Sequence, residues 1–352
     1  MSTSSLSSHT DAIAEQRARE RRRWRACGVF LALTLAGLVL DIATGPSLLS
    51  PLEVLKSLTG LGERQPMTDA IVRDLRLPIA LMALAVGAAL GAGGAQMQTL
   101  LNNPMASPYT LGMAAAAGCG AALSLALGSF GLGALIGVPL GAFVFAMLAA
   151  LFLFALASLK RTGSDTIILG GIALLFLFQS LLSLVQFLSS PELSQQILFW
   201  LFGSLGRATW TTLAIVAGVT LLCCILLLRD AWKLAALRLG EARAESLGVD
   251  IRRLRLKVLI LVAVMTATAT SFVGVIGFVG LVAPHIARWQ VGEDQRFLLP
   301  LSAICGALML SFASVLSKSI LPGALFPVGI VTAIVGVPFL LWLIFAPRRP
   351  SL

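Results

Sequence analysis

The sequence predicts an all-α, polytopic membrane protein with ten transmembrane helices, one of them a short, broken return helix near residues 274–288. The chain has 352 residues, of which 58% are hydrophobic and 12% charged, and its mean hydropathy is +0.94. Residues 77–159 contain no charged side chain at all. A water-soluble domain cannot bury that much apolar surface, and the apolar runs do not alternate as they would in a transmembrane β-barrel.

The first half of the chain predicts five spans. A basic run at residues 1–25 precedes the first span, and three prolines divide segment 45–76 into short pieces. A glycine-rich turn containing Pro139 separates the third span from the fourth. The predicted spans are, in order, residues 26–43, 77–102, two within 111–159, and 167–188.

The second half predicts the other five spans, and one segment in it determines the count. Residues 258–287 carry no formal charge. A straight helix of this length would be about 45 Å long, whereas the hydrocarbon core is about 30 Å thick. Basic residues flank the segment on both sides, so we expect the chain to cross and return through a shorter helix, broken at the glycines of residues 274–280. The remaining spans are residues 211–228, 297–316 and 326–345.

The charge distribution predicts the topology. If alternate connections face the cytosol, they hold 20 of the 26 Lys and Arg residues, as the positive-inside rule expects. Both termini, residues 1–25 and 347–352, are then cytosolic tails, and residues 26–346 form one membrane domain. The net charge of +10 is explained by this topology and by contact with lipid, so we expect no nucleic-acid partner.

The most polar stretch of the chain lies at residues 229–257 and holds 12 of the 42 charged residues. Within it we expect a surface helix that a soluble partner can grip, ending at Gly248. Leu239, Ala242, Ser246 and Leu247 fall on one side of this helix, whereas Glu241 and Glu245 fall on another and are expected to touch no core.

A polar stripe on the fifth span is a candidate for the translocation pathway. Gln179, Ser183 and Gln186 share one face of a helix. Uncharged side chains that form hydrogen bonds suit a large polar solute that must pass without sticking. The alternative is hydrogen bonding between helices, and the same two interpretations apply to Gln96 and Gln98.

Three cations fall on the outer side, where the topology disfavours them: Arg73, Arg76 and Lys318. They are interpreted as anchors for lipid headgroups or as docking groups for a partner that carries carboxylates.

The sequence shows no catalytic or metal-binding pattern. The five cysteines lie in apolar spans without metal-type spacing, and His285 has no second ligand near it, so we expect neither a metal nor a cofactor. No ionisable residue falls at mid-membrane, and Asp41 is expected at the interface. Both an ion-coupled secondary transporter and an intramembrane enzyme are therefore disfavoured.

Four segments together resemble one family of permeases. They are residues 76–112, 236–250 (ALRLGEARAESLGVD), 277–288 (GFVGLVAPHIAR) and 326–344. These segments are similar to the permease subunits of bacterial ABC importers for iron-siderophore complexes, haem and cobalamin, the FecCD-like family. The resemblance covers nearly the whole chain, with the motifs in the same order and spacing.

The resemblance implies a ten-span protomer in a bacterial inner membrane, which pairs with a second copy or with a close relative. It also implies two cytosolic ATPase subunits and a periplasmic binding protein. ATP hydrolysis would then belong to a partner, and this chain would not be an enzyme. The segment that would couple to the ATPase comprises Leu239, Gly240, Glu241, Ala242, Glu245, Leu247 and Gly248.

The leading expectation is import of a chelated-iron complex, with haem and cobalamin as alternatives. The chain departs from the family pattern at Ile79 and Lys318, where arginine is usual, and at Phe326, where glutamate is usual. These departures bear on the docking cations and on the cargo.

Overall fold

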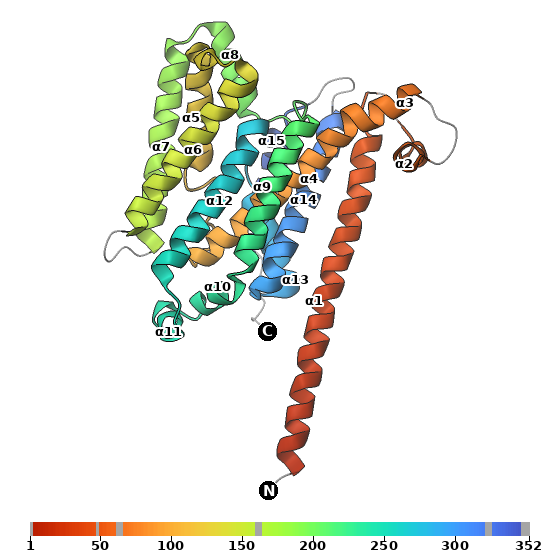
Figure 1. The fold of residues 1–352 in the computed structure, drawn as a ribbon, viewed down its shortest axis with the longest axis vertical. Helices are drawn as coiled ribbons and strands as arrows, with labels where there is room; N and C mark the ends of the chain where they lie inside the picture. Colours follow the sequence, from red (N-terminus) through yellow and green to blue (C-terminus); the bar gives the residue numbers. More distant parts are fainter. Residues whose placement is uncertain (1–2, 47–48, 61–65, 159–163, 321–325, 346–352) are drawn as a thin grey trace.

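The computed structural model describes residues 3–46, 49–60, 66–158, 164–320 and 326–345, and all of the regular secondary structure in these residues is helical (Figure 1). The described residues form 17 helical elements. In chain order they are α1 (Thr3–Ala43), α2 (Pro51–Thr59), α3 (Pro66–Ala70), η1 (Ile71–Arg76), α4 (Leu77–Leu100), α5 (Met113–Ala126), η2 (Gly128–Gly131), α6 (Ala134–Ser158), α7 (Ser164–Leu188), α8 (Pro191–Leu201), α9 (Trp210–Leu228), α10 (Ala231–Leu237), α11 (Glu241–Ser246), α12 (Ile251–Val273), α13 (Val279–Val291), α14 (Gln295–Ile320) and α15 (Val328–Phe345).

Each of the ten predicted spans has a helix in the structure, which confirms an all-helical, polytopic membrane protein. Among the described residues, seven helices are long and apolar enough to cross a membrane. They lie in α1, in the continuous stretch from α3 to α4, and in α6, α7, α9, α12 and α14. The other three, α5, α13 and α15, are shorter.

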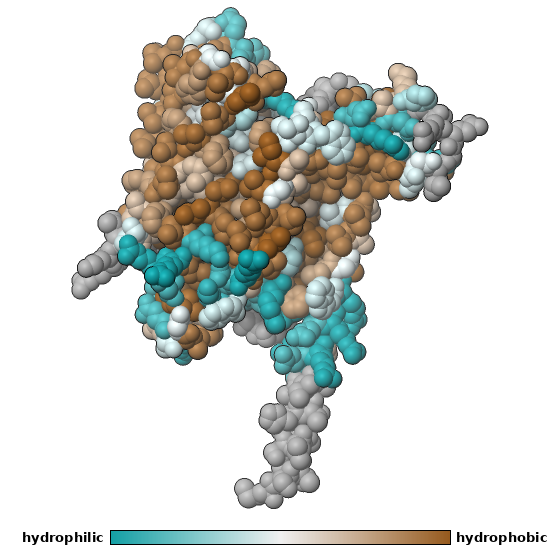
Figure 2. All heavy atoms as spheres, viewed as in Figure 1, coloured by the Kyte–Doolittle hydropathy of each residue, from teal (hydrophilic) through white to brown (hydrophobic). Residues whose placement is uncertain are grey.

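The polar and apolar residues are separated along the bundle. Figure 2 shows hydrophobic side chains over its middle, with hydrophilic side chains gathered around α10, α11 and the stretch of α1 at the same level. We call this the basic end, because residues 17–25 and 229–257 bring most of their arginines there. Helices α2, α3 and α8 lie at the opposite end (Figure 1).

The first helix is longer than predicted, since α1 runs without interruption from Thr3 to Ala43 and so includes most of the predicted tail. It is held against α14 at the basic end, where Arg23 Nη1 lies 2.9 Å from Asp294 Oδ2 and the ring of Trp24 packs edge-on against Phe297. The predicted C-terminal tail, residues 347–352, lies outside the described residues.

The predicted broken return helix is confirmed. Helix α12 ends at Val273, and Gly274 follows with φ 79° and ψ −165°, a conformation that only glycine adopts readily. Residues 274–278 are not helical, and α13 then returns toward the basic end as a helix of 13 residues.

A second break lies between α4 and α5. Residues 101–112 form a loop, Asn102 at its start has a left-handed φ of 45°, and α5 is only 14 residues long. The two breaks meet, because a Cβ on Gly277 would lie 3.5 Å from the ring of Tyr109. Non-helical backbone is tolerated at membrane depth where protein surrounds it, and each of these two segments packs against the other.

Glycines allow α4 to occupy the centre of the bundle. A Cβ on Gly306 of α14 would lie 2.1 Å from the carbonyl oxygen of Gly87, and a Cβ on Gly94 would lie 1.8 Å from that of Gly280 in α13. The backbones of α4, α13 and α14 therefore touch directly, which is the small-residue packing expected between helices in lipid.

We predict that Gly306→Ala lowers the free energy of unfolding by about 1–3 kcal/mol, because the added methyl overlaps a backbone carbonyl that cannot move aside cheaply. The measurement is the thermal unfolding midpoint of the purified protein in detergent. Gly218→Ala in α9 is the matched control, because nothing lies within 4 Å of a Cβ there. Equal midpoints for the two variants would contradict close packing of α4 on α14.

Candidate coupling segment and transport path

The polar segment forms two short helices rather than one continuous run. Gly240, with φ 103°, separates α10 from α11, so Leu239 precedes the break and does not belong to the same helix as Ala242. The expectation of a single surface helix is therefore wrong at its start. The predicted end is correct, because Gly248 has φ 81° and α11 stops at Ser246.

The predicted contact residues nevertheless lie on the surface. Leu239 and Leu247 are each 58% exposed, although both are large and apolar. Gly240, Ala242, Glu245 and Gly248 are exposed as well. Ala244 and Val249, by contrast, are buried and hold the segment against the bundle. The segment thus presents an apolar and polar surface on a fixed base, and its role in coupling stays a prediction.

Glu241 differs from the expectation that it touches no core. Its Oε1 accepts a hydrogen bond of 2.5 Å from Nη2 of Arg255, whose side chain is only 11% exposed. Glu241 therefore ties α11 to the start of α12, whereas Glu245 makes no ion pair among the described residues.

Asp230 provides a second tie to α12. This buried carboxylate pairs with Lys233, at 2.7 Å, and with Lys257 of α12. Burial by itself would raise the pKa of Asp230, but the hydrogen bonds from the two lysines outweigh it and leave the pKa below its ordinary value.

Sequence reasoning missed a further network at the basic end. Arg238 binds both Asn102 and Glu293, and Glu293 also pairs with Arg288 at 2.9 Å. The partners of Arg238 are 136 and 55 positions away in the chain, so no local pattern signals them.

The structure places Gln96 and Gln98 in contacts between helices. Gln96 Nε2 donates to Gln295 Oε1 at 3.3 Å, and Gln98 Oε1 accepts from Arg288 Nη1 at 2.8 Å. Both glutamines are buried. Hydrogen bonding between helices is therefore the correct interpretation for these two residues.

The polar stripe on α7 lies at the surface of the single protomer. Gln179 and Ser183 are exposed and Gln186 is half-buried. Leu181 and Leu184 beside the stripe are 39% and 52% exposed. One protomer therefore presents both the polar face of α7 and its apolar flanks to the outside.

Two of the three predicted docking cations are not accessible, which corrects the expectation that they face a partner. Arg76 is 7% exposed and donates to the carbonyls of Ile42 and Ala43 at 2.9 and 3.0 Å. Lys318 has a side chain 6% exposed and pairs with Asp41 Oδ1 at 2.7 Å.

The burial of these cations has a clear physical reason, since a charge that leaves water needs a partner. Asp41, expected at the interface, is fully buried and supplies that partner for Lys318, and Ser314 also donates to its carboxylate at 2.8 Å. Arg73 alone of the three is exposed, and it donates to the carbonyl of Ser57 at 3.0 Å.

The described residues hold no group of three or more metal-ligating side chains. His285 is buried, and its Nδ1 lies 2.8 Å from the carbonyl of Leu281, one turn earlier in α13. The five cysteines are free thiols.

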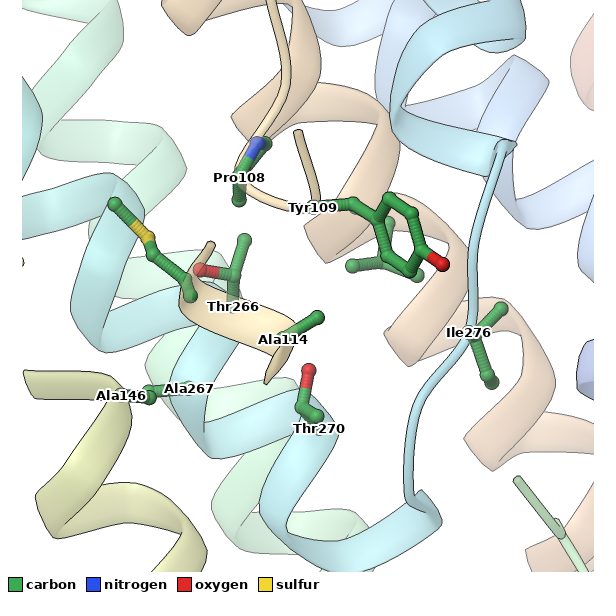
Figure 3. Close-up of a pocket in the computed structure, with 10 residues that line it drawn as sticks. Pro108, Tyr109, Ala114, Ala146, Thr266, Ala267, Thr270 and Ile276 are labelled. Atoms are coloured by element: carbon green, nitrogen blue, oxygen red, sulfur yellow. The ribbon is translucent and has the colours of Figure 1, made fainter. Parts of the chain in front are cut away.

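A small cavity of about 20 Å³ lies where the two chain breaks meet (Figure 3). Tyr109 of the α4–α5 loop and Ile276 of the α12–α13 break border it, and Thr266 and Thr270 of α12 line it. A cavity of this size holds about one water molecule, so it does not accommodate a cargo.

The fold and these surfaces define a polytopic, helical membrane protein with an exposed polar segment at its basic end. The profile of the FecCD transport family matches residues 33–346, and the chain belongs to that family. It is the permease subunit of an ABC transporter and is not itself the catalytic subunit.

Individual relatives match over most of their length. The chain is 36% identical over 279 residues to the hemin transport system permease protein HmuU of Yersinia pestis, covering 78% of this chain and 83% of that protein. It is 32% identical over 336 residues to the vitamin B12 import system permease protein BtuC of Vibrio vulnificus, covering 93% and 96%. A solved inward-facing structure assigned to the metal-chelate type of ABC transporter matches with a TM-score of 0.81 and 29% identity, covering 91% and 99%.

We predict that Asp41→Asn destabilises the protein by about 3–5 kcal/mol, because it leaves the ammonium group of Lys318 buried without a counter-charge. The thermal midpoint in detergent measures the effect. Glu15→Gln serves as the control, because its ion pair with Arg19 is exposed and should contribute little. A midpoint for Asp41→Asn equal to that of the control would show that Lys318 is not buried as described.

Proposed function

We propose that this chain is the permease subunit of an importer that moves a chelated-iron complex from a periplasmic binding protein into the cytoplasm. Two separate ATPase subunits drive it, and two copies of the chain form the pathway in a bacterial inner membrane. The observation that carries the proposal is the exposed segment from Leu239 to Gly248, fixed to the bundle by ion pairs on both sides of Gly240. A segment of this kind suits docking to a soluble subunit that supplies the energy.

The charges of the bundle favour an external source of energy. A transporter driven by ions needs a titratable or coordinating group along its path. The buried carboxylate of Asp41 is already neutralised by Lys318, and Asp230 is paired with two lysines at the basic end. Neither group is free to carry a proton or an ion across, which supports ATP-driven transport over ion-coupled transport.

The α7 stripe supports the cargo class. Gln179, Ser183 and Gln186 offer amide and hydroxyl groups without charge, which suit a large polar complex that must bind weakly and leave. If a second copy faces the first across α7, the two stripes line a common path. The exposure of Gln179 and Ser183 in one protomer supports this arrangement.

The basic end is proposed to face the cytoplasm, because it collects the arginines of residues 17–25 and 229–257. Residues 1–25 and 347–352 are then the cytoplasmic tails and residues 26–346 the membrane domain. The opposite end receives the binding protein, for which Arg73 is the docking cation that remains accessible.

We predict that the permease, reconstituted with its ATPase and binding protein in proteoliposomes, takes up a ferric hydroxamate siderophore when ATP is supplied. The variant Glu245→Arg should abolish this uptake, because it reverses an exposed charge on the docking surface without disturbing an ion pair. The measurement is uptake of labelled cargo, with hemin and cyanocobalamin offered in parallel.

The control for that experiment is Glu15→Arg, which reverses an exposed glutamate on α1. Uptake of hemin or cyanocobalamin in place of the siderophore would contradict the proposed cargo but not the proposed class of importer. Uptake that persists in Glu245→Arg would contradict the assignment of α11 to the coupling surface.

We predict that cysteines at Gln179, Ser183 and Gln186 react with a membrane-impermeant thiol reagent in the assembled transporter, because water reaches the face that lines the path. Cysteines at Leu181 and Leu184 should be protected by lipid or by the second copy. The test uses a variant that lacks the five native cysteines. Equal reactivity at all five positions would assign the stripe to helix packing.

A further inference from the structure

We propose that Arg238 is the positioning residue that passes movement of the coupling segment to the inner ends of α4 and α13. The inference rests on the proposed function and adds to it a specific route into the bundle. Arg238 lies between α10 and α11, two residues before the break at Gly240. Its guanidinium donates from Nη1 to Asn102 Oδ1 at 2.7 Å and from Nη2 to Glu293 Oε1 at 2.7 Å.

Each acceptor lies beside an interruption of a helix. Asn102 begins the α4–α5 loop and holds a left-handed φ of 45°. Glu293 follows Gly292, which ends α13 with φ 72°. Arg238, directly before the coupling segment, thus holds the two points at which the chain leaves α4 and α13.

The two points belong to one linked unit. Arg288 of α13 lies 2.9 Å from Glu293 Oε1 and donates to Gln98 Oε1 of α4 at 2.8 Å. Gln98 in turn donates to the carbonyl of Leu281 in α13 at 3.3 Å. Farther along the loop, Tyr109 packs on Gly277 at the start of the return helix. The end of α4, the α4–α5 loop and α13 are therefore connected by contacts at three places along α13.

The other ion pairs that join the polar segment, residues 229–257, to the bundle lead elsewhere. Glu241 and Asp230 pair with Arg255 and Lys257, and both of these lie on the uninterrupted helix α12. A displacement of α11 against α12 would thus be taken up by a continuous helix, whereas a displacement passed through Arg238 acts on segments that end in breaks. Arg238 is the member of the set that reaches the C-terminal ends of both α4 and α13.

The chemistry of the contact suits this role. A guanidinium holds two acceptors at once in fixed geometry, whereas the ammonium group of lysine is a point charge and does not reproduce this bridge. Glu293 binds both arginines through Oε1, and its buried Oε2 has no hydrogen-bond partner among the described residues. The carboxylate can therefore exchange oxygens as Arg238 moves without losing the pair.

A purely stabilising role would be small here. The side chains of Arg238 and Glu293 are 27% and 39% exposed, and ion pairs at such exposure contribute little to folding. Loss of Arg238 should therefore change coupling between ATP hydrolysis and transport much more than it changes stability.

The test compares Arg238→Gln and Arg238→Lys in the complete transporter in proteoliposomes. We expect both variants to keep ATPase activity and the thermal midpoint close to wild type while cargo moved per ATP falls about 10-fold. Arg253→Gln is the matched control, because that side chain is 89% exposed and pairs only locally with Asp250 among the described residues. A wild-type ratio in Arg238→Gln, or a parallel fall of ATPase activity, transport and midpoint, would overturn the inference.

A second readout does not depend on the cargo, so it separates this inference from the proposed import. A single cysteine at Met105, which is 44% exposed on the α4–α5 loop, is labelled with a membrane-impermeant maleimide with and without ATP. We expect ATP to change the labelling rate, and Arg238→Gln to remove the change. Failure of all three cargoes with this result intact would reject the proposed cargo alone. An ATP-dependent change that persists in Arg238→Gln would reject Arg238 as the positioning residue.

Discussion

The arrangement depends on one constraint: a backbone that leaves the helical conformation inside a membrane must be enclosed by protein. Two segments of this chain leave the helical conformation in this way, residues 101–112 and 274–278, and each lies against the other. Because the breaks adjoin, α5 and α13 are short, and the loop before α5 comes within reach of the polar segment at the basic end. The glycine contacts of α4 with α13 and α14 make this possible by bringing three backbones together without side chains between them.

Much of the fold follows from the sequence alone, since helix number and the return helix need only lengths, charges and glycines. Residues 258–287 are too long for one crossing and too short for two ordinary ones, so the break at Gly274 could be predicted. The uninterrupted course of α1 could not be predicted, because a run of basic residues before a span can form either a helix or an irregular tail. The break at Gly240 is visible as a glycine, but its left-handed φ depends on how α10 and α11 are tied down.

The candidate sites were predicted less completely, because charged groups acquire their meaning from partners far along the chain. Lys318 and Asp41 are 277 positions apart, and without that pairing Lys318 reads as a surface cation. The reverse holds for Gln98, which reads as a path-lining amide until Arg288 is placed 2.8 Å away. The surface position of the predicted coupling residues could be expected from a local signal, the polar segment around them, and Leu239 and Leu247 are indeed exposed. Arg238 carries no such signal.

The attachment of α1 has a mechanical consequence. Asp41 joins it to Lys318 near one end of α14, and Arg23 joins it to Asp294 just before the other end. A rod pinned to its neighbour at two points about 27 Å apart can neither slide nor roll along it. Helices α1 and α14 therefore behave as a single beam, and α4, which touches α14 backbone to backbone, shares its stiffness. The freedom that a transport cycle requires is left to the segments outside this frame, such as the loop that precedes α5.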